Sequence, residues 1–207
     1  LVSSTAVTLT FSRRSRDEPE AAGALAAGVL GACTVLIVRV ALVTFVLNQA
    51  TAWALLPYLA APLAVGLVLV LRGFRRRVAT GVSAEAPMAR AVSPLRLASA
   101  IRMAVLFQGS LMALAWVRLQ FGDPGVLPLA ALLGLTDMDA LTISMAKLRP
   151  AAEMASLGAQ AIAVGLLSNT ALKFGLAVGL GERQYRRSAG TGLVLLGAAT
   201  LLGFLLF

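Results

Sequence analysis

The sequence has few of the residues on which most enzymes and metal-binding proteins depend. It contains no histidine and one cysteine, Cys33, so a Cys/His metal site, a histidine proton relay and an internal disulfide are all excluded. Charged residues make up 13% of the 207 residues, whereas an average soluble protein has about a quarter. That is too little polar surface to cover a soluble globule of this size.

Apolar residues dominate instead, at 59% of the chain, with a mean hydropathy of +0.88. They occur in runs long enough to cross a bilayer, which takes about 20 residues in a helix. We therefore predict an all-α integral membrane protein, a single polytopic domain over residues 1–207 in contact with the lipid bilayer. About six transmembrane helices are expected, at residues 21–47, 50–71, 95–121, 126–146, 151–180 and 188–207.

Two of the apolar segments are less regular than the others. Residues 1–12 have the pattern of a truncated N-terminal helix, whose start would precede the chain. The charge-free centre of residues 95–121 is short for a bilayer, so an amphipathic helix lying in the interface is the alternative to a crossing helix there.

The basic residues lie mostly in loops and give the chain a formal net charge of +9. No basic patch is interleaved with aromatic residues, so nucleic acid is not an expected partner. Loops rich in Lys and Arg face the cytoplasm, and the long loop 72–94 is expected there. If every span crosses, eleven basic residues from Arg13 to Arg149, including Lys147, lie on the cytoplasmic side. Four lie opposite: Arg118, Arg183, Arg186 and Arg187. The last three form a cluster that contradicts this orientation.

The chain also resembles itself at an offset of 134 residues. Residues 1–13 then align with 135–147, and Arg39 aligns with Lys173. The alignment indicates two similar halves, residues 1–71 and 95–207, joined by the loop 72–94. Because an even number of crossing helices would separate equivalent helices, we predict a parallel repeat.

The strongest local signal is residues 134–144 (GLTDMDALTIS), where Asp137 and Asp139 interrupt an apolar run. A charge at the centre of a membrane helix costs about 2.5–3.5 kcal/mol by the lower estimates. Residues two apart point about 200° away from each other on a helix, so a break near Gly134 is indicated. Carboxylate oxygens, with the hydroxyls of Thr136 and Thr142, suit a hard divalent cation such as Mg²⁺. The alternative is a shorter helix, with both carboxylates at the membrane interface.

Further polar residues lie deep in other spans. Arg39 and Lys173 could bind an anion or act as counter-charges to the two aspartates; alternatively, the four charges only neutralise one another. The run Ser168, Asn169 and Thr170 can supply neutral oxygens to an ion. It can equally hold helices together through hydrogen bonds, each commonly worth ~1 kcal/mol or less.

Three stretches resemble a known family: residues 1–9 (LVSSTAVTL, followed by RRSR), 134–142 (GLTDMDALT) and 167–173 (LSNTALK). They are similar to the C-terminal membrane domain of bacterial MgtC/SapB-type proteins, a domain of unknown function, DUF 4010. The resemblance implies a multi-pass protein of the bacterial inner (plasma) membrane. Because the magnesium association of that family belongs to a different domain, magnesium remains a hypothesis.

The sequence contains no nucleophile elbow, phosphate-binding loop or zinc-binding helix, so we do not expect an enzyme. The leading hypothesis is a transporter or channel-like domain for a small ion. A homo-oligomer is a possible assembly of the chain. The first alternative is a non-transporting membrane module that anchors, senses or regulates a partner protein. A membrane enzyme with an Asp-x-Asp metal site is the second, and it requires a water-open cleft around Asp137.

Overall fold

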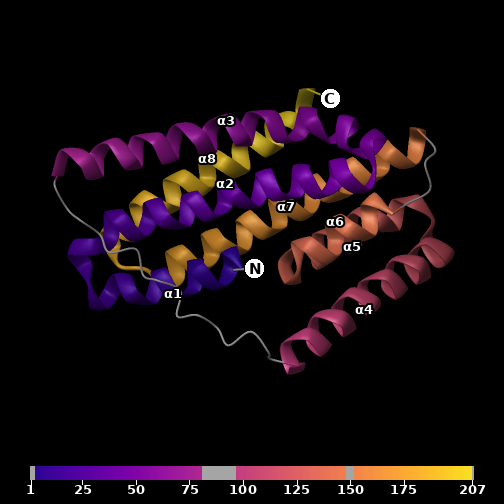
Figure 1. Ribbon diagram of the computed structural model, residues 1–207, viewed down its shortest axis with the longest axis horizontal. Helices are drawn as coiled ribbons and strands as arrows, with labels where there is room; N and C mark the ends of the chain where they lie inside the picture. The colour runs from indigo at the N-terminus through magenta and orange to yellow at the C-terminus, as the bar shows by residue number, and fades with distance from the viewer. Residues whose placement is uncertain (1–2, 81–96, 148–151, 207) are drawn as a thin grey trace.

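The computed structural model describes residues 3–80, 97–147 and 152–206, and within these ranges the protein is helical. Figure 1 shows the helices in chain order. They are α1 (Ser4–Asp17), α2 (Ala22–Leu47), α3 (Gln49–Thr80), α4 (Leu97–Phe121), α5 (Val126–Thr136), α6 (Met138–Ala146), α7 (Ala152–Leu180) and α8 (Arg183–Leu206).

Four of these helices, α2, α3, α7 and α8, are long and apolar enough to cross a membrane. Their outward side chains are apolar and bare, as in Val46 (80% exposed) and Leu205 (76%), which identifies a membrane-embedded helical bundle. The predicted bounds are confirmed to within a few residues, with two exceptions: α3 continues to Thr80 rather than ending at Leu71, and α8 begins at Arg183 rather than Ser188. The reason for the early start of α8 is Glu182, whose Oε2 accepts a hydrogen bond from the Gln184 N–H.

The expectation of a single span over residues 126–146 is wrong. The chain breaks at Asp137, whose φ of −149° and ψ of 104° are those of extended backbone. In Figure 1, α5 runs inward from the end of the bundle where α4 finishes, and α6 returns to that same end. The two short helices form a hairpin that does not cross the bundle. A break near Gly134 was expected, and it occurs three residues later because Asp137 caps a new helix.

Hydrogen bonds fix which ends of the helices lie together. At one end, here called the first end, Arg16 Nη2 donates to the Gly179 carbonyl and the Glu182 N–H donates to Ser15 Oγ. At the second end, Asn48 Nδ2 donates to the Ala146 carbonyl. The start of α2 therefore lies beside the end of α7, and the two helices are antiparallel.

The hairpin changes the distribution of charge along the bundle. Because residues 126–146 do not cross, Arg183, Arg186 and Arg187 lie at the first end with Arg13, Arg14 and Arg16, which is opposite to the sequence-based assignment. Lys147 moves to the second end, where Arg118 contacts Met154. The cluster that contradicted the orientation thus joins the other basic residues.

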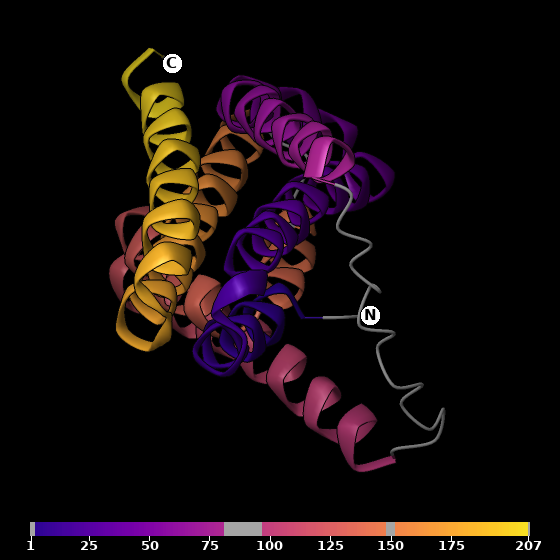
Figure 2. The ribbon, with the colours of Figure 1, turned by 90° about the vertical axis from the view of Figure 1, so that its left-hand side faces the viewer.

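Helix α4 packs against α5 and α6 at the edge of the bundle, and Figure 2 shows it standing apart from the four long helices. A crossing helix and an interfacial helix both stay predictions for α4. The hairpin itself is seated firmly: a Cβ atom on Gly134 of α5 would collide with the backbone of Gly165 on α7. This close approach places the hairpin tip against the middle of α7.

Candidate functional site

The candidate site begins at the tip of the α5–α6 hairpin, where Asp137 is the N-cap of α6. Its Oδ1 accepts hydrogen bonds from the N–H groups of Asp139 (2.8 Å) and Ala140 (3.1 Å). These are two of the donors that a helix start leaves unpaired. From the other side, Asn169 Nδ2 of α7 donates to the Gly134 carbonyl at 2.9 Å. The tip is therefore held by its own carboxylate and by one buried amide.

An ion pair links this tip to α2. Arg39 Nη2 lies 2.7 Å from Asp139 Oδ1, and the two side chains are 26% and 27% exposed. Among the residues that the structure describes, the fully buried Arg39 Nε has no hydrogen-bond partner. The guanidinium thus keeps one unused donor inside the bundle after pairing with the carboxylate.

Lys173 of α7 is the most buried of the charged residues predicted for the site, with 1% exposure. Its ammonium lies within hydrogen-bonding reach of the Cys33 thiol on α2, and Arg39 is near enough to repel it. None of the ion pairs found in the described ranges includes Lys173. It is a buried cation whose described partner is a thiol, a weak acceptor.

The remaining predicted residues are placed as follows. Thr142 and Thr170 are buried, and each hydroxyl donates to a carbonyl of its own helix, at Met138 (2.7 Å) and Leu166 (2.8 Å). Thr136 is exposed and donates to the Leu133 carbonyl. Ser168 is half-buried on α7 beside Asn169. The structure thus gathers Asp137, Asp139, Arg39, Lys173 and Asn169 near the hairpin tip, while these three threonine hydroxyls bind their own helices.

A divalent cation finds little support in this arrangement. Asp137 Oδ1 is occupied by two N–H groups and Asp139 Oδ1 by Arg39. Over the described residues, no cluster of three or more His, Cys, Asp or Glu side chains is suited to a metal ion. The cation site at the two aspartates stays a prediction.

Sequence reasoning did not find Cys33 as a site residue. The signal was present, because Cys33 lies on the same apolar helix as Arg39, six residues earlier. A polarisable thiol in an apolar run is common in buried cores, so its position beside Lys173 needed the structure.

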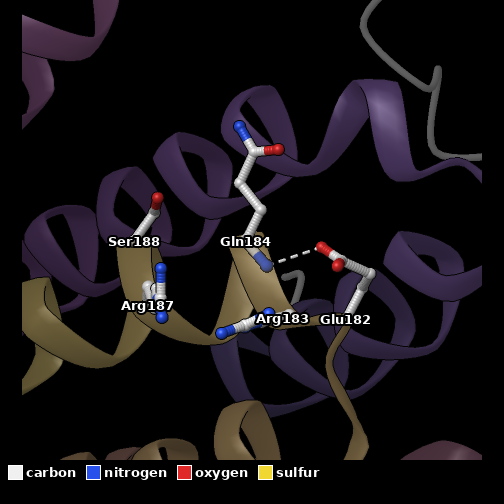
Figure 3. Close-up of a pocket in the computed structure, with 5 residues that line it drawn as sticks. All are labelled: Glu182, Arg183, Gln184, Arg187 and Ser188. Atoms are coloured by element: carbon white, nitrogen blue, oxygen red, sulfur yellow. Dashed lines mark hydrogen bonds between the residues drawn. The ribbon is translucent and has the colours of Figure 1, made fainter.

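A cleft of about 470 Å³ lies away from this cluster, at the first end of the bundle. Figure 3 shows its lining, which comes from the turn between α7 and α8 and from the first turns of α8. The lining residues are Glu182, Arg183, Gln184, Arg187 and Ser188. One short segment supplies the whole lining, so the cleft brings no separate elements together, unlike the hairpin tip.

A family model described as a domain of unknown function (DUF4010) matches residues 1–181 of the chain. The chain belongs to the DUF4010 family. Over 189 residues it is 26% identical to an uncharacterized protein of Aquifex aeolicus (strain VF5), covering 89% of this chain and 80% of that protein. No solved structure matches the chain. The DUF4010 resemblance is thereby confirmed, whereas the relation to MgtC/SapB-type proteins stays a prediction.

The DUF4010 match contains every residue of the candidate site. It runs from the start of the chain through α7 and ends at Gly181, so Arg39, Asp139 and Lys173 all lie within it, and α8 lies beyond it. The polar cluster is therefore part of the DUF4010 domain.

Proposed function

We propose that this DUF4010 domain moves a small ion across the membrane through a site at the tip of the α5–α6 hairpin. The observation that carries the proposal is a helix broken inside the bundle, with charged side chains at the break. Charged residues inside membrane segments are costly and typically mark ion pathways. Broken helices are tolerated at membrane depth where they are buried in protein or line a cavity.

We further infer that the two halves are inverted repeats, not the parallel repeats expected from the sequence. At the offset of 134 residues, the N-cap Ser3 of α1 corresponds to Asp137, the N-cap of α6. The start of α3 at Gln49 corresponds to the start of α8 at Arg183. The helix contacts agree with this correspondence, in which α1 matches α6, α2 matches α7 and α3 matches α8. Helices α1 and α6 each contact both α2 and α7, and α3 contacts α7 as α8 contacts α2.

The inversion follows from the hairpin. The parallel expectation counted residues 126–146 as a crossing helix; with α4 taken as a crossing helix and residues 126–146 not, an odd number of crossings separates the halves. The equivalent helices α2 and α7 are accordingly antiparallel, as the hydrogen bonds at the two ends require. Inverted repeats in transporters place the substrate near the bilayer midplane, between the repeats. Arg39 and Lys173, equivalent residues of the two halves, lie in that position.

The charge distribution supports an orientation for the transporter. Of the basic side chains described outside the site, eight lie at the first end and two at the second. The eight are Arg13, Arg14, Arg16, Arg72, Arg75, Arg183, Arg186 and Arg187, and the two are Arg118 and Lys147. By the positive-inside rule, the first end faces the cytoplasm, and we place the protein in the bacterial inner membrane on that basis and on the family resemblance.

Ion flux into liposomes containing the purified protein tests the proposal. The expected result is flux of at least one small ion, reduced at least tenfold by Asp139→Asn, which removes the charge that holds Arg39. Asp123→Asn is the matched control, because Asp123 pairs with Arg118 in an exposed ion pair outside the site. A folded protein that moves none of a panel of small cations and anions contradicts transport and favours the anchoring or sensing module. Unchanged flux in Asp139→Asn would instead remove the hairpin tip from the pathway.

A further inference from the structure

We propose that the ion is a small inorganic anion, bound by Lys173 of α7 and Arg39 of α2. This inference rests on the proposed function and assigns the sign of its substrate. Both residues lie deep in their helices, and they are close enough to repel each other. An anion between them would neutralise that repulsion.

The two halves supply different counter-charges to these equivalent cations. Arg39 pairs with Asp139 at 2.7 Å, and Asp137 caps the same helix. At the offset of 134, the positions equivalent to Asp137 and Asp139 are Ser3 and Thr5 of α1, which are neutral. A capped helix start thus occurs in both halves, at α6 and at α1. The start of α1, which corresponds to Lys173 in the proposed repeat, lacks both carboxylates.

Unused hydrogen-bond donors point to the same ligand class. The Lys173 ammonium has three donors, is 1% exposed, and has the Cys33 thiol as its described partner. Arg39 Nε is a further buried donor, and it has no acceptor in the described ranges. Buried polar groups in stable proteins are almost always paired, and an anion supplies acceptors to both side chains at once.

One unpaired acceptor refines the proposal. Asn169 Oδ1, one helical turn before Lys173, is buried and has no hydrogen-bond partner within the described part of the chain. An anion cannot pair with this oxygen directly, but a water molecule of its hydration shell can donate to it. The site therefore suits a small anion that keeps part of its hydration.

The ends of two short helices favour the same sign. Helices α1 and α6 both begin partway along the bundle and not at its ends, and a helix N-terminus carries the positive end of the helix dipole. Asp137 offsets this charge on α6, whereas α1 is capped by the neutral Ser3. A cation at the two aspartates would have to displace Arg39, whereas an anion at Lys173 displaces no described ion pair.

The test is anion-dependent protection of Cys33, the only cysteine of the chain. A membrane-permeant maleimide reports its accessibility in the purified wild-type protein, titrated with chloride, nitrate or phosphate as sodium salts. Sodium gluconate at equal ionic strength is the control. We expect one small anion to slow labelling at least fivefold, with a saturable dependence on its concentration. Equal labelling rates in all four salts overturn the proposal without requiring any variant.

Variants then assign the effect to Lys173. Lys173→Gln should weaken the apparent affinity for the anion at least tenfold, while Lys173→Arg should retain it. Arg187→Gln removes one positive charge from the exposed first end and should leave the affinity unchanged. Protection that is equally strong in a folded Lys173→Gln protein contradicts the assignment. If Lys173→Gln does not fold, the proposal is still tested by the wild-type titration and by the anion affinity of Lys173→Arg.

Flux separates this proposal from the one on which it rests. Cation flux without anion protection leaves the transporter standing and rejects the anion. Anion protection without flux of any ion supports the anion site and rejects transport. Anion flux that is lost in Lys173→Gln and kept in Arg187→Gln supports both.

Discussion

In the proposed repeat, Arg39 and Lys173 are equivalent residues, 134 residues apart, yet their surroundings differ. Arg39 faces a helix start that carries two carboxylates, and it pairs with one of them. Lys173 is the more buried of the two, and its described partner is a thiol. If the repeat is real, the same backbone holds an ion pair in one half and leaves an unmatched charge in the other. We expect Asp139 to maintain the fold by holding Arg39, and Lys173 to bind the ligand together with the unused Nε donor of Arg39.

The largest expected effect comes from breaking the ion pair. Arg39→Met leaves the Asp139 carboxylate without its partner inside the bundle and should destabilise the protein by about 3 kcal/mol. The double variant Arg39→Met/Asp139→Leu should recover most of that loss. Unfolding free energies measured in detergent, combined as a double-mutant cycle, give the coupling. A coupling near zero would show that the pair does not stabilise the fold.

A second comparison concerns Gly165 and Gly31, which correspond to each other in the proposed repeat. A Cβ atom on Gly165 would collide with Leu141 under the hairpin, whereas at Gly31 of α2 nothing lies within 4 Å. Gly165→Ala should therefore destabilise by about 1–3 kcal/mol, and Gly31→Ala should stabilise by up to about 1 kcal/mol through helix propensity. Thermal unfolding of the two variants side by side measures the difference. Equal effects would mean that the hairpin does not rest closely on α7.

Removal of the unmatched charge should act oppositely to removal of the paired one. Lys173→Met replaces a buried ammonium by an apolar side chain of similar length. Because no described ion pair is broken, we expect unchanged stability or a gain of about 1–2 kcal/mol, together with loss of anion binding. Denaturant unfolding in anion-free gluconate is the appropriate measurement. A loss above 2 kcal/mol would identify Lys173 as a structural residue.

The smallest effects are expected at the helix caps. Asp137 accepts two N–H bonds, of 2.8 and 3.1 Å, whereas Ser3 accepts one at 3.5 Å. Asp137→Ala should cost about 1–2 kcal/mol and Ser3→Ala a few tenths. Amide hydrogen exchange at the first turns of α6 and α1 compares them locally. Greater loss of protection in α1 than in α6 would reverse the assigned order.

Much of the bundle could be predicted from hydropathy alone, since α2, α3, α7 and α8 coincide with long apolar runs. The hairpin could not, because residues 126–146 are long enough to cross and hydropathy does not record a reversal of direction. Two sequence signals did oppose a crossing helix: Asp137 is a favoured helix N-cap residue, and the Arg183–Arg187 cluster violated the positive-inside rule. The Arg183–Arg187 cluster already contradicted the predicted orientation, and the α5–α6 hairpin removes this contradiction.

The candidate site was predictable in its residue types but not in its partners. Buried charge alone selected Arg39, Lys173 and the two aspartates. Which cation pairs with which carboxylate depends on the directions of the helices. Because residues 126–146 were predicted as a crossing helix, the predicted direction of α7 relative to α2 was wrong. Asn169 was considered as helix glue, and its hydrogen bond to Gly134 agrees with that interpretation. Its unpaired oxygen, like the position of Cys33, follows from packing at the hairpin tip.

The unmatched Lys173 also has an electrical consequence. A charge that moves across the whole membrane changes its energy by about 2.3 kcal/mol per 100 mV. The joined Arg39 and Asp139 carry no net charge, so a shift of the hairpin together with α2 moves the Asp137 carboxylate as its uncompensated site charge. A displacement of α7 carries Lys173 with it, and it senses the potential unless an anion travels alongside. Occupied and empty forms of the protein should therefore respond differently to voltage, because the gating charge that α7 contributes should be present only in the empty form.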